Sequence, residues 1–232
     1  MKLKDAVDSY MKQVPEVKTY CERCLRTERW DGSIVLMIVD AAFTSIGLNY
    51  FLAVVPKVDE FRKKHVEAGN IHTVEDLASV NEEHLKNIWQ NKRSWHMAKS
   101  VAYYLAQIKK QKGVDDKKAF IHWAQSSSLE NWQENPIGQI KGVGINTFQY
   151  LRMMGGIDTV MPDKIVKRVI AEMLGKTGEN MTKNDIDFVK QVELIAQETG
   201  HKAIELCWMT WLIQSEAGMS RMAKYSAVLP QI

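Results

Sequence analysis

The stretch Ile137-Gly-Gln-Ile-Lys-Gly-Val-Gly-Ile-Asn-Thr147 of this 232-residue chain has the composition of a tight glycine turn between two helices. Gly142 and Gly144 permit a turn that is too tight for side chains, and they expose successive backbone N–H groups. Such groups bind a phosphate oxygen as the N-terminus of a helix does. The stretch therefore predicts a helix-hairpin-helix motif with a phosphate clamp at its turn.

The side chains around the turn have expected places in this motif. Ile137 and Ile140 are apolar and lead into the turn. We expect Val143 to plug between the two helices and Thr147 to lie in the first turn of the second helix. Asp163 follows nineteen residues after the second glycine, directly before another helical pattern. The sequence thus predicts a phosphate clamp beside a single carboxylate.

This pairing of hairpin and Asp resembles the endonuclease III-like superfamily of DNA glycosylases, named for its helix-hairpin-helix, Gly/Pro-rich loop and Asp (HhH-GPD). The likeness covers residues 33–218. Residues 33–61 resemble the family's first core helices, and residues 73–108 resemble its next helical pair. Residues 156–163 resemble its Gly/Pro-rich loop, and residues 207–218 resemble its late helix.

The resemblance implies an all-α fold of two helical domains with a DNA-binding cleft between them. Residues 33–154 would form a central helical barrel that contains the hairpin. Residues 1–32 and 155–232 would form the second domain, which carries Asp163. The implied partner is double-stranded DNA with a damaged or mismatched base, bound by a monomer.

Hydrophobic periodicity independently favours helices. Apolar side chains recur at three- and four-residue steps near both chain ends, for example in residues 3–14, 165–174 and 189–196. Only Ile34-Val-Leu-Met-Ile-Val39 has the local composition of a strand, and no second alternating run could pair with it. We interpret it as a buried helix. It is also the longest apolar run and is too short to cross a bilayer.

Composition narrows the class of protein but does not select a function. Hydrophobic residues make up 45% of the chain, which is enough to bury a substantial core. The net charge is only +3, so a nucleic-acid surface must come from local clusters of basic residues. Three cysteines do not make a disulfide framework, and the first residues lack the apolar stretch of a signal peptide. We expect a cytoplasmic protein that contacts no membrane, associated with the nucleoid if the source is prokaryotic.

Asp163 is the predicted catalytic residue. Cleavage of the bond between a base and its deoxyribose builds positive charge on the sugar, and a nearby carboxylate stabilises that charge in the transition state. At the start of a helix the carboxylate is expected to accept N–H bonds and to stay ionised at neutral pH. The alternative is a plain N-cap that stabilises its helix by about 1 kcal/mol.

Asn146 bears on the type of reaction. Family members that also cut the strand carry a lysine at this position, two residues after the second hairpin glycine, and its amine forms a Schiff base with C1′. An amide cannot do so, and the resemblance therefore implies a glycosylase without lyase activity. Lys141 or Lys164 could replace that lysine from a different position, which leaves a bifunctional glycosylase and AP lyase open.

No cofactor is expected. Many relatives hold an iron-sulfur cluster with four cysteines after the last helix, and no cysteine follows Cys207 here. Cys21 and Cys24 have the spacing of half a zinc site, but no second pair of ligands is apparent, and we interpret them as reduced helix cysteines. The resemblance leaves open a monovalent cation at the hairpin.

DNA contacts are expected from two regions besides the hairpin. Arg93, in a basic turn, is the first candidate for a side chain that fills the gap left by an extruded base, and Phe43 is a candidate apolar wedge. Arg93 could instead be a solvated charge, and Phe43 could instead be a core residue. Phosphate contacts are predicted for basic residues next to the carboxylate: Lys164, Lys167 and Arg168. Three tryptophans are interpreted as packing residues: Trp30, Trp208 and Trp211.

Two other functions remain open. The chain could be a catalytically inactive DNA-binding protein that keeps the hairpin, because the residues around the motif depart from the family's pattern at Lys141, Asn146 and Phe148. It could also be an unrelated helical interaction module with an accidental glycine turn.

Overall fold

The computed structural model describes residues 2–214 and residue 232, and these residues form helices and no strand. The expected all-α fold is confirmed. The late helix was expected to reach residue 218, and the end of that range lies outside the described residues, as does the rest of the chain up to residue 231. The α-helices are α1 (Leu3–Met11), α2 (Val17–Leu25), α3 (Ile34–Thr44), α4 (Val55–Phe61), α5 (Val74–Ser79), α6 (Lys92–Lys112), α7 (Asp116–Ser126), α8 (Ile145–Met154), α9 (Lys164–Gly175), α10 (Asp185–Thr199) and α11 (Ala203–Gln214). Four short 3-10 or π segments join them: η1 (Arg29–Gly32), η2 (Tyr50–Val54), η3 (Arg62–Val66) and η4 (Glu82–His84).

Helix α3 lies at the centre of the fold. It contains the strand-like run at its start, and every residue from Ile34 to Phe43 is buried. Ser33 caps the helix by accepting a hydrogen bond from the backbone N–H of Leu36 at 3.3 Å. A helix that is apolar all round must be enclosed on every side, and α3 contacts α4, α5, α6, α7 and α8. The prediction of a buried helix is confirmed.

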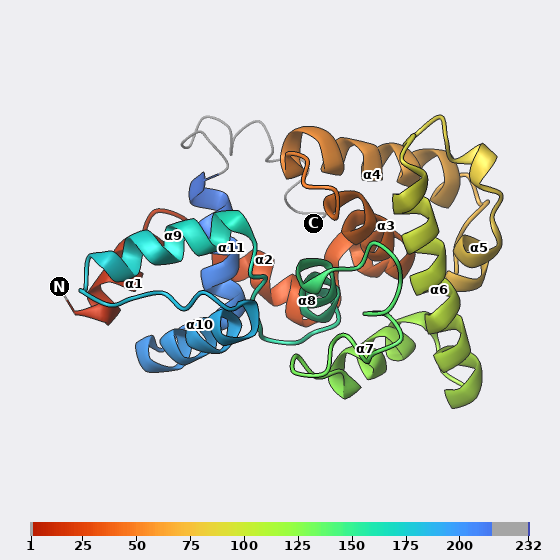
Figure 1. Cartoon of the computed structure of the whole chain (residues 1–232). Helices are drawn as coiled ribbons and strands as arrows, with labels where there is room; N and C mark the ends of the chain where they lie inside the picture. Colours follow the sequence, from red (N-terminus) through yellow and green to blue (C-terminus); the bar gives the residue numbers. More distant parts are fainter. Residues whose placement is uncertain (1, 215–231) are drawn as a thin grey trace.

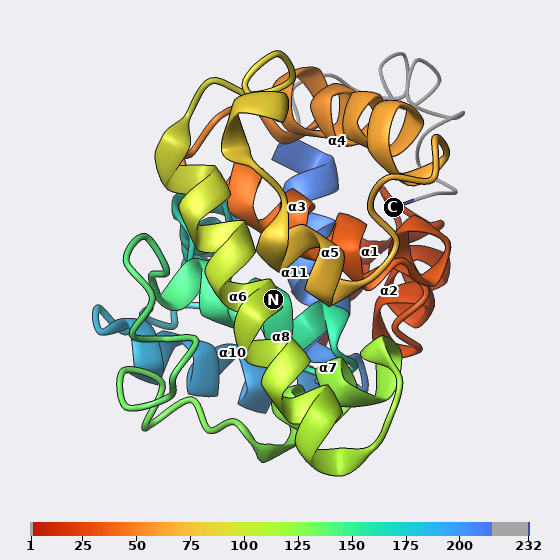
Figure 2. The same cartoon turned by 90° about the vertical axis from the view of Figure 1, so that its right-hand side faces the viewer.

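Helices α3 to α8 pack together on one side of the molecule, with the long helix α6 across their outer face (Figure 1, Figure 2). Asn91 caps α6 by accepting from the backbone N–H groups of Arg93 and Ser94. Gly113 ends it in a left-handed conformation.

Helices from both ends of the sequence pack together on the other side (Figure 1). Helix α1 contacts α9, α10 and α11, and α11 also contacts α2 and α9. Helix α2 contacts α8 as well, so it joins this group to the α3–α8 group. No helix among the described residues has both the length and the apolar character needed to span a bilayer.

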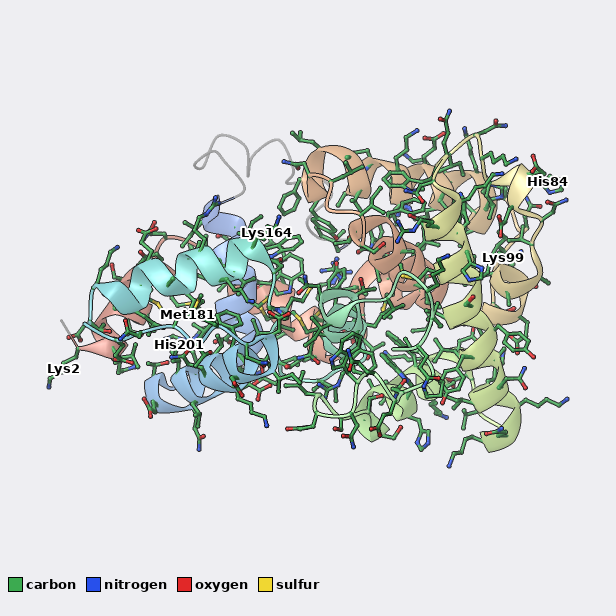
Figure 3. The ribbon with its side chains drawn as sticks, viewed as in Figure 1. Lys2, His84, Lys99, Lys164, Met181 and His201 are labelled. Carbon is green, nitrogen blue, oxygen red and sulfur yellow. The ribbon has the colours of Figure 1, made fainter. Side chains whose placement is uncertain are left out.

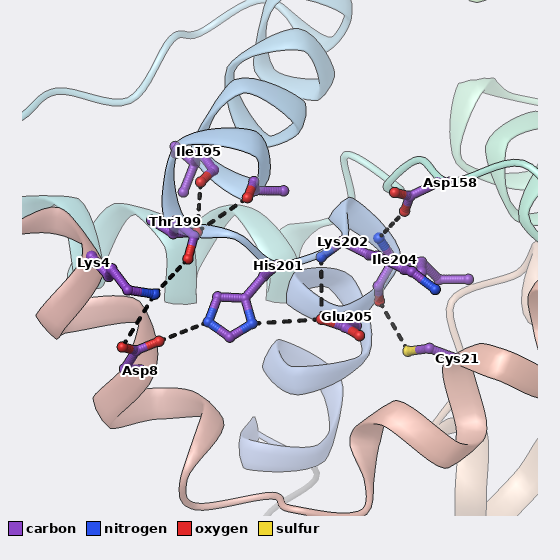
Figure 4. A network of polar contacts seen from close by, with 11 residues as sticks. Lys4, Asp8, Cys21, Asp158, Ile195, Thr199, His201, Lys202, Ile204 and Glu205 are labelled. Carbon is purple, nitrogen blue, oxygen red and sulfur yellow. Dashed lines mark hydrogen bonds and ion pairs between the residues drawn. The ribbon is translucent and has the colours of Figure 1, made fainter.

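A polar network fastens α1 to the end of α10 and the start of α11 (Figure 4). His201 Nε2 lies 2.7 Å from Asp8 Oδ1, and Lys4 Nζ donates to the carbonyl oxygen of Thr199 at 2.7 Å. The hydrogen bond from His201 lowers the pKa of Asp8. This network holds the N-terminal helix beside the helices that follow residue 155.

The hairpin differs from the expected one in its first helix. Between the end of α7 and the start of α8, residues 127–144 form turns, including Gln139 N–H to Asn135 O at 3.0 Å and Ile140 N–H to Ile137 O at 3.2 Å. Gly138 is required here, because a Cβ at this position would lie 1.8 Å from the carbonyl oxygen of Trp132. Isolated helical turns replace the predicted first helix.

Candidate active site

A cavity of about 690 Å³ lies where α3, η2, α8, α9 and α11 meet. Its lining combines aromatic rings, one carboxylate, two basic residues and the start of α8: Ala41, Thr44, Ser45, Gly47, Leu48, Asn49, Tyr50, Phe51, Asn146, Thr147, Tyr150, Met161, Asp163, Lys164, Ile165, Arg168 and Trp211. The cavity thus brings Asp163 together with the hairpin helix, which precedes it in sequence.

Asp163 is the N-cap of α9, and both of its carboxylate oxygens accept a hydrogen bond. Oδ1 accepts from the backbone N–H of Val166 at 2.8 Å, and Oδ2 accepts from Trp211 Nε1 at 2.7 Å. Among the described residues, no cation forms an ion pair with this carboxylate. The side chain is half-buried and lines the cavity. Its orientation is therefore fixed from two helices.

Burial acts on the ionisation of Asp163 in addition to the expected N–H bond. Burial raises the pKa of Asp163 above its ordinary value, although the N–H bonds from Val166 and Trp211 act in the opposite direction. The sequence revealed the capping bond but not the burial, and burial is the larger effect. A raised pKa means that the surroundings destabilise the ionised carboxylate. Positive charge that develops on a ligand therefore stabilises that ionised form more strongly.

The hairpin presents the N-terminus of α8 to the same cavity. Gly142 has a φ of +104°, which favours glycine, whereas Gly144 has a φ of −105° and serves as the N-cap of α8 without a side-chain hydrogen bond. Asn146 and Thr147, in the first turn of α8, line the cavity with Asp163. Thr147 is buried and Asn146 is exposed. Val143 is buried.

The basic residues of α9 differ in their contacts. Lys164 lies at the end of α9 nearest the α3–α8 group (Figure 3), and it lines the cavity together with Arg168. Lys167 is not part of the cavity lining. Its ammonium pairs with Asp185 and lies 5.6 Å from the ring centroid of Phe188. The predicted phosphate contact at Lys167 stays a prediction.

Arg93 and Lys141 lie on neighbouring segments outside the cavity lining. Both side chains are exposed, and Arg93 is in the first turn of α6. A Cβ on Gly142 would lie 3.9 Å from Met97 Sδ, one turn further along α6. The N-terminal part of α6 thus borders the hairpin turn, and its basic residues extend the basic surface beside it.

Phe43 is a core residue and not a wedge. Its side chain is 0% exposed, and its ring stacks on Trp89 with centroids 4.2 Å apart and meets Trp95 edge-on at 5.0 Å. Position 43 faces inward because α3 is enclosed on all sides. Exposed apolar side chains lie near the cavity in the loop after α3 and in η2. Ile46 and Leu48 in the loop are 38% and 49% exposed, and Leu52 in η2 is 51% exposed.

Several cavity residues were not recognised as site residues in the sequence, and three of them are aromatic residues with polar contacts near the proposed site. Trp211 was interpreted as packing, and it orients Asp163. Tyr50 and Tyr150 come from η2 and α8, a hundred residues apart in sequence, and their hydroxyls meet at 3.3 Å. No local pattern marks residues that converge from such distances. The other two tryptophans that were interpreted as packing residues, Trp30 and Trp208, are buried.

The cysteines are free and buried on α2 and α11. Cys21 Sγ donates to the carbonyl oxygen of Ile204 at 3.5 Å, and burial raises the pKa of Cys24 to about 11. No cluster of three or more His, Cys, Asp or Glu side chains with metal-binding geometry is found in the part of the chain that the structure describes. The absence of an iron-sulfur cluster and of a zinc site therefore remains a prediction.

Comparisons with known proteins bear on the fold and the family. A family model described as "Domain of unknown function (DUF8548)" matches residues 8–215. Among solved structures, the chain is similar to the crystal structure of the 8-oxoguanine DNA glycosylase of Thermotoga maritima, with a TM-score of 0.54 and 16% identity. The similarity covers 93% of this chain and 97% of that chain. No curated protein sequence matches the chain. At this identity the likeness establishes the fold.

Proposed function

The chain belongs to the family described as domain of unknown function DUF8548, and we propose that it is a DNA glycosylase. In this proposal it hydrolyses the bond between a damaged or mismatched base and its deoxyribose, after the base has left the duplex. The likeness of its fold to a glycosylase fold supports the class of enzyme. The geometry of the cavity supports the reaction.

The observation that carries the proposal is the shared cavity of Asp163 and the start of α8. Backbone N–H groups at a helix N-terminus suit a phosphate, and a carboxylate nearby suits the positive charge of an oxocarbenium-like sugar. Asp163 is held by Val166 and Trp211 in one orientation before any ligand arrives. A fixed charge costs no reorganisation at the moment of reaction.

The proposed reaction is hydrolysis without strand cleavage. Asn146 lines the cavity at the position where lyase relatives have their lysine, and its amide cannot form an imine. Lys164 also lines the cavity, next to Asp163, which makes it the amine best placed for a second, bifunctional mechanism. Lys141 does not line the cavity. Borohydride trapping of an enzyme-DNA adduct, abolished in Lys164→Gln, would favour that second mechanism.

DNA is proposed to lie over the hairpin turn and the mouth of the cavity. Arg93 and Lys141 are exposed beside the turn and would meet phosphates. The apolar loop after α3 takes the role first assigned to Phe43. Leu48 is both exposed and part of the cavity lining, so it is the side chain best placed to enter the base stack when a base leaves it.

A panel of duplexes, each with one lesion and each followed by hot alkali to reveal abasic sites, tests this function. The panel should contain uracil and thymine mismatches, oxidised pyrimidines, 8-oxoguanine and alkylated purines. We expect base release from at least one of them. Tight, salt-dependent duplex binding without any base release would favour the inactive DNA-binding protein instead. A lack of duplex binding would favour the unrelated interaction module.

A further inference from the structure

A buried ion pair lies behind the wall of the cavity, and the proposed chemistry makes no use of it. Arg29 Nη2 and Asp40 Oδ2 are 2.9 Å apart, and both side chains are 0% exposed. Trp30 Nε1 donates to the same carboxylate oxygen at 2.8 Å, and Thr44 Oγ1 donates to the other oxygen at 3.2 Å. Asp40 thus binds three donors, two from η1 and one from α3.

Two cavity-lining tyrosines are bound to this pair. Tyr50 and Tyr150 donate their hydroxyl protons to Asp40 Oδ2 at 2.9 and 3.1 Å. The same hydroxyl oxygens accept from Arg29 Nη2 at 2.6 and 2.9 Å. Each hydroxyl therefore forms its hydrogen bonds with fully buried partners. The small part of each tyrosine that reaches the cavity lining is therefore ring carbon and not hydroxyl.

Stability alone is a poor explanation for this arrangement. A buried ion pair is often less stabilising than apolar residues of the same volume. The guanidinium of Arg29 also keeps Nε and Nη1 buried without a hydrogen-bond partner among the described residues, although it lies 4.8 Å from the ring centroid of Trp208. The turn that supplies Arg29 is strained, with φ between 50° and 55° at Thr27, Trp30 and Asp31.

The pair connects to the proposed catalytic residue through one ring contact. The rings of Tyr50 and Trp211 meet edge-on with centroids 5.4 Å apart, and the indole of Trp211 donates to Asp163. The contacts thus run from Asp40 through Tyr50 and Trp211 to Asp163. A shift of Tyr50 would remove support from the side chain that orients the carboxylate.

We propose that the Arg29–Asp40 pair is a positioning device for the cavity wall. It holds Tyr50 and Tyr150, which are only 5% and 1% exposed, with their hydroxyls turned into the protein, so that a base in the cavity meets an apolar wall rather than phenol hydroxyls. Through Tyr50 it also supports Trp211. The base as ligand rests on the proposed function, whereas the fixed orientation of the two rings does not.

The test removes the pair without leaving a buried charge. Arg29→Met with Asp40→Leu replaces both partners by apolar residues, so no unpaired charge is left in the interior. The protein is labelled with 3-fluorotyrosine, and the ¹⁹F resonances of Tyr50 and Tyr150 are assigned from Tyr50→Phe and Tyr150→Phe. Tyr103→Phe, at an exposed site, is the matched control. Thermal unfolding, duplex Kd and single-turnover base release are measured on the same samples.

In the unmodified protein we expect one narrow resonance for each of the two tyrosines. In the folded double variant we expect both to broaden or split, with base release reduced roughly tenfold to a hundredfold and duplex Kd unchanged. Narrow, unshifted resonances together with undiminished base release would overturn the proposal. If the unmodified protein releases no base, the glycosylase function fails, and the ¹⁹F spectra still decide whether the pair positions the rings.

A second variant covers the case in which the double variant does not fold. Tyr50→Phe keeps the ring and the ion pair but removes one hydroxyl, and the resonance of Tyr150 then reports on the remaining wall. We expect that resonance to shift or broaden and base release to fall, with no such change in Tyr103→Phe. An unchanged Tyr150 resonance and unchanged base release would overturn the proposal here as well.

Discussion

The indole of Trp211 donates a hydrogen bond of 2.7 Å to Asp163, which joins the side of α11 to the first residue before α9. The two residues are 48 positions apart in sequence. This bond fixes the carboxylate that we propose as catalytic, and it opposes the rise in the pKa of Asp163 that burial causes. Orientation and charge of Asp163 therefore both depend on Trp211.

Replacing Trp211 by Phe should move the pH dependence of base release. Burial raises the pKa of Asp163 and the bond from Trp211 lowers it, so loss of that bond leaves the pKa higher still. Since the ionised carboxylate is the proposed active form, activity is lost as the pH falls through this pKa. We expect the acid limb of single-turnover base release to begin at a higher pH in Trp211→Phe, with duplex Kd unchanged. Superimposable pH profiles would contradict this role.

Gly144→Ala should weaken DNA binding without harming the fold. The backbone of Gly144 has an ordinary conformation, and a Cβ there would meet nothing within 4 Å. The added methyl group would occupy the approach of a phosphate to the start of α8. Loss of a hydrogen bond to a charged group costs about 1.5–3 kcal/mol, so duplex Kd should rise roughly tenfold or more. Gly175→Ala, at the open end of α9, is the control that should bind DNA normally.

Two lysines on α9 should respond differently to removal of their charge. Lys164 lines the cavity, and Lys164→Gln should reduce the slope of log Kd against log salt by about one. Lys167 is paired with Asp185, and Lys167→Gln should leave that slope unchanged. Titrations of duplex binding at several salt concentrations measure both. Equal slopes for the two variants would argue against DNA at the cavity mouth.

Substitutions at Leu48 and at Phe43 should distinguish a surface wedge from a core residue. Leu48 is about half exposed, so Leu48→Ala should change the free energy of unfolding by no more than about 0.5 kcal/mol. It should nevertheless slow base release from duplex DNA more than release from a single strand, because only a duplex requires the stack to be opened. Phe43→Ala should cost about 3–5 kcal/mol of stability. Equal slowing on both substrates would remove the wedge role from Leu48.

The helical fold could be predicted from the sequence because its signals are local. Three- and four-residue spacing identified the helices near both ends, and the absence of a partner strand identified Ile34–Val39 as helical. Asp163 could be placed before a helix for the same reason. The first hairpin helix could not be judged, because the close approach of Gly138 to Trp132 depends on the fold of the whole loop.

The cavity wall depends on tertiary contacts that leave no local pattern. Tyr50 and Tyr150 become neighbours only because α3, η2 and α8 surround one buried carboxylate. The sequence left Phe43 open as a wedge or a core residue, and it is enclosed because α3 is covered on every side. Lys167 was grouped with its neighbours in sequence, and only the tertiary structure shows that its ammonium is paired with Asp185.

The most direct measurement of the central claim compares Asp163→Asn with the unmodified protein on the lesion duplex that is processed fastest. Asn is also a good N-cap, so the start of α9 should be preserved. We expect unchanged duplex Kd and a loss of base release of roughly a hundredfold to a thousandfold, because the fixed negative charge beside the sugar is gone. Base release at the original rate by a folded, DNA-binding Asp163→Asn protein would contradict the account.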